Sequence, residues 1–270
     1  MEVFNHTGEF PNGHHAEGRI AVLSDIHGQS DLFRHALAAI ERPEETCLIL
    51  LGDYIDRGPD TLGCLHLLND VLDADLFKDI VMLPGNHEGM LSGALNGGIR
   101  ELILWSQNGG ASVIEEVDGD LGVLRRLLPT QVWDRMSGTL PAFYETGSLL
   151  MVHAGLNPDV DAEAFLSQPY QTPRTQSESA GSWAWVRDAC LKHEQAFKGR
   201  DGEDRFLIHG HSSCDMTERH ETALQWVLPQ TDNRMCLDLS RAGRLPLLQA
   251  EDTQFKIRMF GHEPYLGYFL

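Results

Sequence analysis

The chain has 270 residues, 42% of them hydrophobic and 23% charged, which is the composition of a globular protein with a substantial core. Its net charge of −19, from 40 acidic and 21 basic residues, repels phosphate backbones and argues against general nucleic-acid binding. No apolar run approaches the roughly 18 residues of a membrane-spanning helix, so no membrane association is expected.

The cysteines and the N-terminus favour a cytoplasmic location. The 5 cysteines are widely spaced and form no C-x-x-C pair, so neither a zinc knuckle nor a disulfide framework is predicted. Residues 1–18 lack the basic start and apolar core of a signal peptide. We expect them to form a loose N-terminal extension before a single domain over residues 19–270.

The first part of the chain alternates between strands and helices. Apolar periodicity predicts strands over 19–24, 46–52 and 79–85, and helices over 30–42 and 60–72, the first of them N-capped by Ser30. The strands are continuous apolar runs, which indicates that helices or a second sheet cover both of their faces. The alternation predicts parallel βαβ units with right-handed crossovers.

The rest of the chain begins with a mainly helical stretch and continues with strands. Residues 88–137 read as mainly helical. Strands are predicted over 148–155, 205–211, 223–228, 234–239 and 254–260. The polar segment 166–182 is predicted to be a long surface loop that lies over a site. We therefore expect one domain with two sheets.

Five of the predicted strands end in the same kinds of residue. The strand ends read "SDIHG" (24–28), "GDYIDRG" (52–58), "GNHEG" (85–89), "HAGL" (153–156) and "HGH" (209–211). In open α/β sheets, ligands bind at the carboxyl ends of strands. The residues expected to converge there are Asp25, His27, Asp53, Asn86, His153 and His211.

This set of side chains has the chemistry of a metal centre. Carboxylates, imidazoles and an amide oxygen, without thiolate, suit Mn, Fe or Zn with open coordination positions. Two ligand groups that share one carboxylate would hold two metals about 3.5–4 Å apart, which can ionise a bridging water and neutralise a phosphoryl oxygen. Each residue alone could be a helix cap, a solvated turn residue or a core histidine. Five strand ends of one kind favour the metal centre.

The ordered motifs resemble a known family. D-x-H-G, G-D-x-x-D-R-G, G-N-H-E, H-A-G and a final G-H are similar to the signature of the PPP family of calcineurin-like metallophosphoesterases, with the bacterial and phage serine/threonine protein phosphatases as the nearest type. The match runs from residue 20 to 211, about 70% of the chain. The resemblance implies an α/β fold in which two mixed β-sheets form a central β-sandwich flanked by α-helices.

The resemblance also implies a role for each matching residue. Asp25, His27 and Asp53 would hold one metal, and Asp53, Asn86, His153 and His211 the other, with Asp53 bridging. His87 matches the general acid that protonates the leaving oxygen, and Asp56 matches the carboxylate that orients it. Arg57 and Arg187 match phosphate-binding arginines, whose planar guanidinium meets two phosphate oxygens at once.

The chain departs from the family pattern at three places. Ser24 stands where glycine is usual, and "GHS" (210–212) stands where G-H-T is common. The segment "LDLSRAG" (237–243) replaces the usual D-T-G, so the turn at this place cannot be inferred from the family.

The sequence thus predicts a phosphomonoesterase with two divalent metals, most simply Mn²⁺, with Fe or Zn as alternatives. The expected substrates are phosphorylated proteins or small phosphoesters, attacked by a hydroxide that bridges the metals. Two alternatives stay open: a diadenosine polyphosphate hydrolase of the same superfamily, and a non-catalytic metal-binding interaction module. The intact "DYIDRG" (53–58) favours the protein phosphatase type. A nuclease is disfavoured by the charge of −19.

Overall fold

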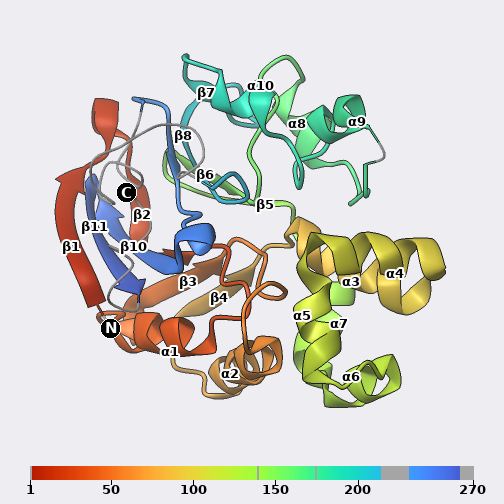
Figure 1. The fold of residues 1–270 in the computed structure, drawn as a ribbon. Coiled ribbons are helices and arrows are strands. Elements are labelled where there is room, and N and C mark those ends of the chain that lie inside the picture. Colours follow the sequence, from red (N-terminus) through yellow and green to blue (C-terminus); the bar gives the residue numbers. More distant parts are fainter. Residues whose placement is uncertain (1, 139, 174, 214–230, 262–270) are drawn as a thin grey trace, which may run out of the picture.

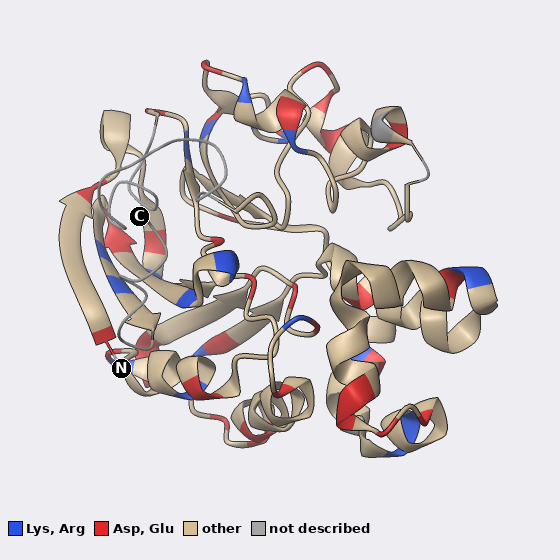
Figure 2. Cartoon of the chain, in the orientation of Figure 1, with Lys and Arg blue, Asp and Glu red and all other residues tan. Residues whose placement is uncertain are grey.

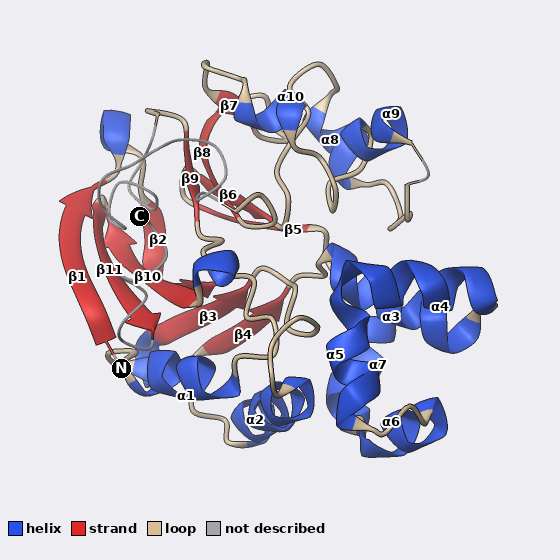
Figure 3. Cartoon of the chain, viewed as in Figure 1, coloured by secondary structure: helices blue, strands red, loops and turns tan. Residues whose placement is uncertain are grey.

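Two β-sheets pack face to face, with helices on their outer faces (Figures 1 and 3). The computed structural model describes residues 2–138, 140–173, 175–213 and 231–261. This arrangement confirms the predicted fold class of two mixed sheets in a sandwich flanked by helices.

The first sheet has six strands in the order β1-β11-β10-β2-β3-β4. Its strands are β1 (Glu2–Glu9), β2 (Ala16–Leu23), β3 (Thr46–Leu50), β4 (Asp79–Met82), β10 (Arg244–Asp252) and β11 (Gln254–Gly261). Strands β2, β3 and β4 are parallel, as the βαβ pattern predicts, with Val22 opposite Ile49 and Ile49 opposite Val81. Strands β1, β11 and β10 add to β2 as antiparallel neighbours.

The second sheet has the order β5-β6-β8-β7, and β9 pairs with β8. Its strands are β5 (Phe143–Thr146), β6 (Leu149–Val152), β7 (Phe197–Lys198), β8 (Asp204–His209) and β9 (Arg234–Cys236). The pairs β6·β8 and β8·β9 are parallel, whereas β5·β6 and β7·β8 are antiparallel. The carboxyl ends of β6 and β8 therefore lie at the same edge.

The helices form three groups (Figure 3). Helices α1 (Ser30–Ala38) and α2 (Thr61–Asp73) connect the parallel strands of the first sheet. The helical region expected over 88–137 consists of α3 (Asn86–Asn96), α4 (Ile99–Trp105), the π-helical turn Ser106–Gly110, α5 (Ala111–Glu116), α6 (Leu121–Leu127) and α7 (Thr130–Ser137). The third group is α8 (Ala162–Leu166), α9 (Gln176–Ala180) and α10 (Asp188–Leu191), and 3-10 turns cover 11–13, 43–45 and 240–242.

Strand β2 shows why its sequence is continuously apolar. Ala21 and Leu23 point toward the helices and join the core with α1, α2 and α3. Ile20 and Val22 point the other way, into the layer between the two sheets. Successive side chains of a strand point to opposite faces of the sheet. Because both faces are covered here, the alternation of apolar and polar residues found in half-exposed strands is absent.

Several predicted elements have different limits in the structure. The helix predicted over 30–42 ends at Ala38. Ser30 is its first residue rather than its N-cap, because the Ser30 hydroxyl donates to the carboxylate of Asp60. Asp60 in turn caps α2 by accepting from the backbone N–H of Gly63. The strand predicted over 223–228 lies outside the described residues.

The N-terminal residues are not the loose segment expected from the sequence. Residues 2–9 form β1, which pairs with β11 from Glu9 opposite Gln254 to His6 opposite Ile257. Phe10 is 3% exposed, and its ring centroid lies 5.1 Å from that of Phe255. The segment therefore contributes to the layer between the sheets.

The segment 166–182 is not a continuous loop. It contains the end of α8 and all of α9. The indole N–H of Trp183, the next residue, donates to the Gln168 carbonyl at 2.8 Å. The Tyr170 hydroxyl donates to the Asn86 carbonyl at 3.0 Å. Tyr170 therefore holds this segment against the start of α3. Among the described residues, no helix is long and apolar enough to cross a membrane.

Phe10→Ala tests whether the N-terminal segment belongs to the fold. Removing this buried ring, which also lies 5.5 Å from the Phe206 ring, should lower the free energy of unfolding by about 3–5 kcal/mol. Ile99→Ala, at a side chain that is 71% exposed, is the control and should change it by less than about 0.5 kcal/mol. Equal effects in urea denaturation would show that residues 2–10 are not part of the cooperative unit.

Candidate dinuclear metal centre

Loops from both sheets bring the predicted site residues together. Asp25 and His27 follow β2, Asp53, Asp56 and Arg57 follow β3, Asn86 and His87 begin α3 after β4, His153 follows β6, and His211 follows β8. All of these side chains except Arg57 are at most 5% exposed. The predicted convergence at the carboxyl ends of the strands is therefore what the fold produces.

Two groups of donor atoms share Asp53. One group is Asp53 with His27 and His87, and the other is Asp53 with His153 and His211. Within each group the donor atoms lie within 4.8 Å of one another. Asp53 Oδ2 lies 3.6 Å from His27 Nε2 and 3.5 Å from His153 Nε2. One carboxylate thus faces both groups, as a bridging ligand must.

Asp25 and Asn86 lie at the edges of these groups. Asp25 Oδ1 is 3.9 Å from His27 Nε2, and the Asp25 carboxylate accepts from the backbone N–H of His211 at 3.0 and 3.1 Å. Asn86 Oδ1 is 3.1 Å from His153 Nε2. By the 4.8 Å distance, His87 falls inside the first donor group, whereas Asp25, which the sequence predicts as a ligand beside His27 and Asp53, lies at the edge of that group.

Backbone carbonyls orient the imidazoles. His27 Nδ1 lies 2.8 Å from the Ile55 carbonyl and His153 Nδ1 lies 2.8 Å from the Leu51 carbonyl. Each Nδ1 must donate to its carbonyl, so each Nε2 presents a lone pair to the site, as metal-ligating histidines do. His211 Nε2 is buried and has no hydrogen-bond partner among the described residues.

The electrostatics of the site fit a bound cation. Burial raises the pKa of Asp53 well above its usual range, and the charges of Asp25 and Glu88 add to the rise. Burial also raises the pKa of Asp25 and lowers the pKa of His153 to about 3. Neutral imidazoles beside carboxylates whose charge is disfavoured are a donor set that a divalent cation would stabilise.

His87 belongs to a second chain of contacts. His87 Nδ1 lies 2.6 Å from Asp56 Oδ2, and His87 Nε2 lies 3.8 Å from Asp53 Oδ2. The Trp105 indole N–H donates to both Asp56 oxygens, at 2.9 and 3.0 Å. Trp105, for which the sequence predicts no role in the site, therefore fixes the carboxylate that orients His87.

The two predicted phosphate-binding arginines approach from different sides. An Arg57 guanidinium nitrogen lies 2.7 Å from His27 Nε2. Arg187 is exposed and donates to the His211 carbonyl at 2.8 Å and to Ser212 Oγ at 3.2 Å. Both arginines thus contact residues of the donor groups, one in each half of the site.

The turns that carry these side chains have unusual backbone conformations. Among the described residues, eleven other than glycine have positive φ, and six of them are predicted site residues: Asp25 (50°), His27 (46°), Asp53 (55°), Asp56 (72°), Arg57 (66°) and His211 (62°). Left-handed backbone costs about 1–2 kcal/mol for such residues. Strain of this kind concentrates at functional sites, where the surrounding structure holds it.

Glycine is required at two of these turns. Gly52 has φ of 99°, and a Cβ there would lie 2.3 Å from the Gly85 nitrogen. A Cβ at Gly210 would lie 1.9 Å from Asp25 Oδ2. Only glycine lets the loops approach closely enough for the donors to meet.

Glu88 holds two of the loops together, a role that the sequence did not reveal. Its carboxylate accepts from the backbone N–H groups of Asp53 at 2.9 Å, Tyr54 at 2.8 Å and Gly85 at 2.8 Å. Glu88 is 1% exposed. The "E" of "GNHEG" (85–89) marks the position, but two of its three partners, Asp53 and Tyr54, lie more than thirty residues away in the chain.

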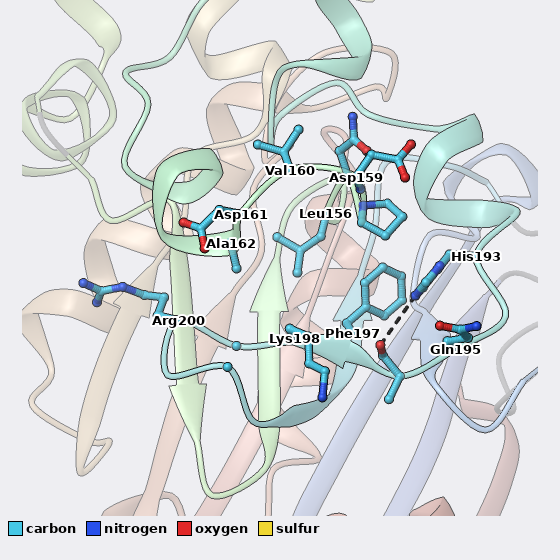
Figure 4. A pocket seen from close by; sticks show the side chains of 15 residues that line it. Leu156, Asp159, Val160, Asp161, Ala162, His193, Gln195, Phe197, Lys198 and Arg200 are labelled. Atoms are coloured by element: carbon cyan, nitrogen blue, oxygen red, sulfur yellow. Dashed lines mark hydrogen bonds between the residues drawn. The ribbon is translucent and has the colours of Figure 1, made fainter.

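A cavity beside β7 is separate from this site (Figure 4). It has a volume of about 440 Å³ and is lined by residues that include Leu156, Val160, His193 and Phe197. His193 Nε2 lies 3.5 Å from the Ala196 carbonyl. None of the predicted site residues lines this cavity.

The sequence is similar to a family of phosphoesterases and to named protein phosphatases. The calcineurin-like phosphoesterase family matches residues 18–265. Serine/threonine-protein phosphatase 1 of Salmonella typhimurium is 37% identical over 90 residues, covering 33% of this chain and 38% of that protein. Serine/threonine-protein phosphatase 2 of Escherichia coli is 36% identical over 100 residues, covering 37% of this chain and 41% of that protein. The matched region thus spans less than half the length of these relatives.

A solved structure has a similar fold. The structure of a protein serine/threonine phosphatase from Saccharomyces cerevisiae with similarity to human phosphatase PP5 aligns with a TM-score of 0.55 at 15% identity. The alignment covers 93% of this chain and 82% of that one. At this identity the likeness concerns the fold.

Glu88→Gln tests the loop contact. The amide places an N–H against buried backbone donors, so the free energy of unfolding should fall by about 2–3 kcal/mol. Glu101→Gln is a matched control, because Glu101 makes the same contact to Gly98 N–H, at 3.0 Å, three residues into an exposed helix. It should cost under about 1 kcal/mol. Equal losses in denaturant titration would contradict a special role for Glu88.

Proposed function

Since this chain belongs to the calcineurin-like phosphoesterase family, we propose that it hydrolyses phosphate monoesters, with phosphoserine and phosphothreonine of proteins as its leading substrates. The observation that carries the proposal is the pairing of His87 with Asp56, at 2.6 Å, beside two donor groups that share Asp53. A metal-binding module without catalysis would need the donors but not an imidazole held by a carboxylate.

Two divalent ions, most simply Mn²⁺ with Fe or Zn as alternatives, fit the donor set. Carboxylate, imidazole and amide donors without thiolate suit these metals, and availability decides between them. We assign Asp25, His27, Asp53, Asn86, His153 and His211 as the ligands. When bound, such ions neutralise phosphoryl oxygens and lower the pKa of water.

His87 would act as the general acid. Asp56 accepts from Nδ1 and stabilises the charged ring, while Nε2 faces Asp53 and the donor groups. Burial and the neighbouring His27 lower the pKa of His87, so the Asp56 carboxylate at Nδ1 is needed to stabilise the ring when Nε2 carries the proton for a leaving oxygen. Trp105 holds Asp56 from the other side and keeps the pair aligned.

Arg57 and Arg187 would bind the oxygens of the reacting phosphate. Arg57 donates to His27 Nε2. If His27 Nε2 bound a metal ion instead, this hydrogen bond would be lost and the guanidinium would be available to bind phosphate. Arg187 is anchored on the His211 carbonyl in the other half of the site. Guanidinium groups suit this task because they meet two phosphate oxygens at once.

A reducing, cytoplasmic location belongs to the same proposal. The four described cysteines, Cys47, Cys64, Cys190 and Cys236, are buried, and no disulfide joins any two of them. Proteins that lack disulfides are typical of reducing compartments.

Turnover by metal-stripped protein, with Mn²⁺ added back, tests the activity. The substrates are p-nitrophenyl phosphate, a phosphothreonine peptide and diadenosine tetraphosphate. We expect metal-dependent phosphate release that is fastest for the peptide. Preference for the dinucleotide would replace the protein substrate by the dinucleotide, and silence on all three with two metals bound would overturn the proposed activity.

His87→Asn tests the general acid. The variant should keep two metals by elemental analysis and lose about 10²–10⁴-fold in kcat, since the leaving oxygen is no longer protonated. His66→Asn, at an exposed position of α2, is the control. Unchanged turnover in His87→Asn with unchanged metal content would remove His87 from the mechanism.

A further inference from the structure

A small cavity opens beside the donor groups. It has a volume of about 150 Å³ and is lined by His27, Gln29, Arg57, Gly58, Ser240 and Arg241. Since a water molecule takes about 30 Å³ of the liquid, the cavity has room for one hydrated phosphate or carboxylate group. His27 and Arg57 belong to the candidate site, so a group bound in the cavity lies next to the reacting phosphate.

Arg241 comes from the segment 237–243, which departs from the family pattern. Between β9 and β10 the chain forms the short 3-10 turn Ser240–Ala242, drawn in blue near the centre of Figure 1. Arg241 is the middle residue of this turn and is exposed. The turn and the loop after β3 therefore form two walls of the same cavity.

The turn that carries Arg241 is well fixed. Asp238 Oδ1 accepts from the backbone N–H of Ser240 at 3.0 Å and from its hydroxyl at 2.7 Å. Gly243 closes the turn with φ of 63° and donates to the Ser240 carbonyl. The Leu237 N–H donates to the His209 carbonyl at 2.7 Å, two residues before His211. The position of Arg241 is therefore tied to the strand end that supplies His211.

The charge of the cavity contrasts with that of the whole protein. The chain carries a net charge of −19, and Figure 2 shows acidic residues on most of its elements. Among the described residues, the lining of the cavity instead includes two arginines and no carboxylate. In an acidic protein, such a local reversal of charge selects an anion at that place.

We propose that this cavity binds a second anionic group of the substrate, a phosphate or carboxylate close to the reacting phosphate, and that Arg241 determines this specificity. The inference rests on the proposed function, because the reacting phosphate is assigned to Arg57 and Arg187. It narrows the substrates to phosphopeptides with an acidic or phosphorylated neighbour. Gln29 adds a neutral amide that can donate to the same group.

The test compares three phosphothreonine peptides of equal length on the manganese-loaded protein. One has neutral neighbours, one has glutamates, and one has a second phosphothreonine, so the set separates carboxylate from phosphate recognition. The wild-type protein should prefer the anionic peptides in kcat/KM. Arg241→Gln should lower kcat/KM about five- to tenfold more for the anionic peptides than for the neutral one.

Two further variants sharpen this comparison. Arg241→Lys keeps the charge and should restore part of the preference. Arg100→Gln removes an exposed arginine of α4 and should leave the preference unchanged. A loss in Arg241→Gln that is equal for all three peptides, or no loss for any, would overturn the inference.

Binding separates this inference from the proposed activity. Non-hydrolysable phosphonate versions of the three peptides are titrated by fluorescence anisotropy. If the protein hydrolyses nothing, the proposed activity fails, and the inference is then decided by binding alone. Tighter binding of the anionic peptides that disappears in Arg241→Gln would support it, and equal affinities for all three would overturn it.

Discussion

The burial of carboxylates in one place is the constraint on which the rest of the site depends. Burial raises the pKa of Asp25, Asp53 and Asp56 and so opposes their charge. A protein interior tolerates such groups only where hydrogen bonds or cations compensate them. Here the backbone N–H groups of His87 and His211 supply part of that compensation, at 3.0 and 3.1 Å. Two cations held by the donor groups would supply the rest of the compensation for the buried negative charge.

The fold meets this constraint by ending strands of two sheets at one edge. The parallel strands β2, β3 and β4 deliver one half of the site, and β6 and β8 deliver the other. Residues with left-handed backbone directly follow several of these strands, so the chain turns immediately and the site side chains stay at the edge of the sheet. Glu88 joins the left-handed turn after β3 to the loop after β4 by accepting from the backbone N–H groups of Asp53 and Gly85. The strain of the turns is thus held by contacts that involve no substrate.

The sequence predicts the parallel strands and the site better than the edges of the sheets. Motifs at strand ends predict which residues converge, because parallel strands end at one edge. Strand β10 is not among the predicted strands, and it contains Pro246, a residue that is unusual in a central strand. In the structure Pro246 is opposite Met259 of β11, and the pairing of β10 with β2 begins at Leu248. The sequence predicts no role for Trp105 or Glu88, because Trp105 contacts Asp56 and Glu88 contacts Asp53 across long stretches of chain.

The strand order of the first sheet has a consequence for biosynthesis. Strand β1 does not lie beside β2; β11 and β10, from the C-terminal end of the chain, separate them. A nascent chain therefore cannot complete this sheet until residues 244–261 have left the ribosome. Such pairing between distant segments slows folding. The parallel strands β2, β3 and β4 can assemble early, whereas β1 must wait, unpaired, for the last strands to be made.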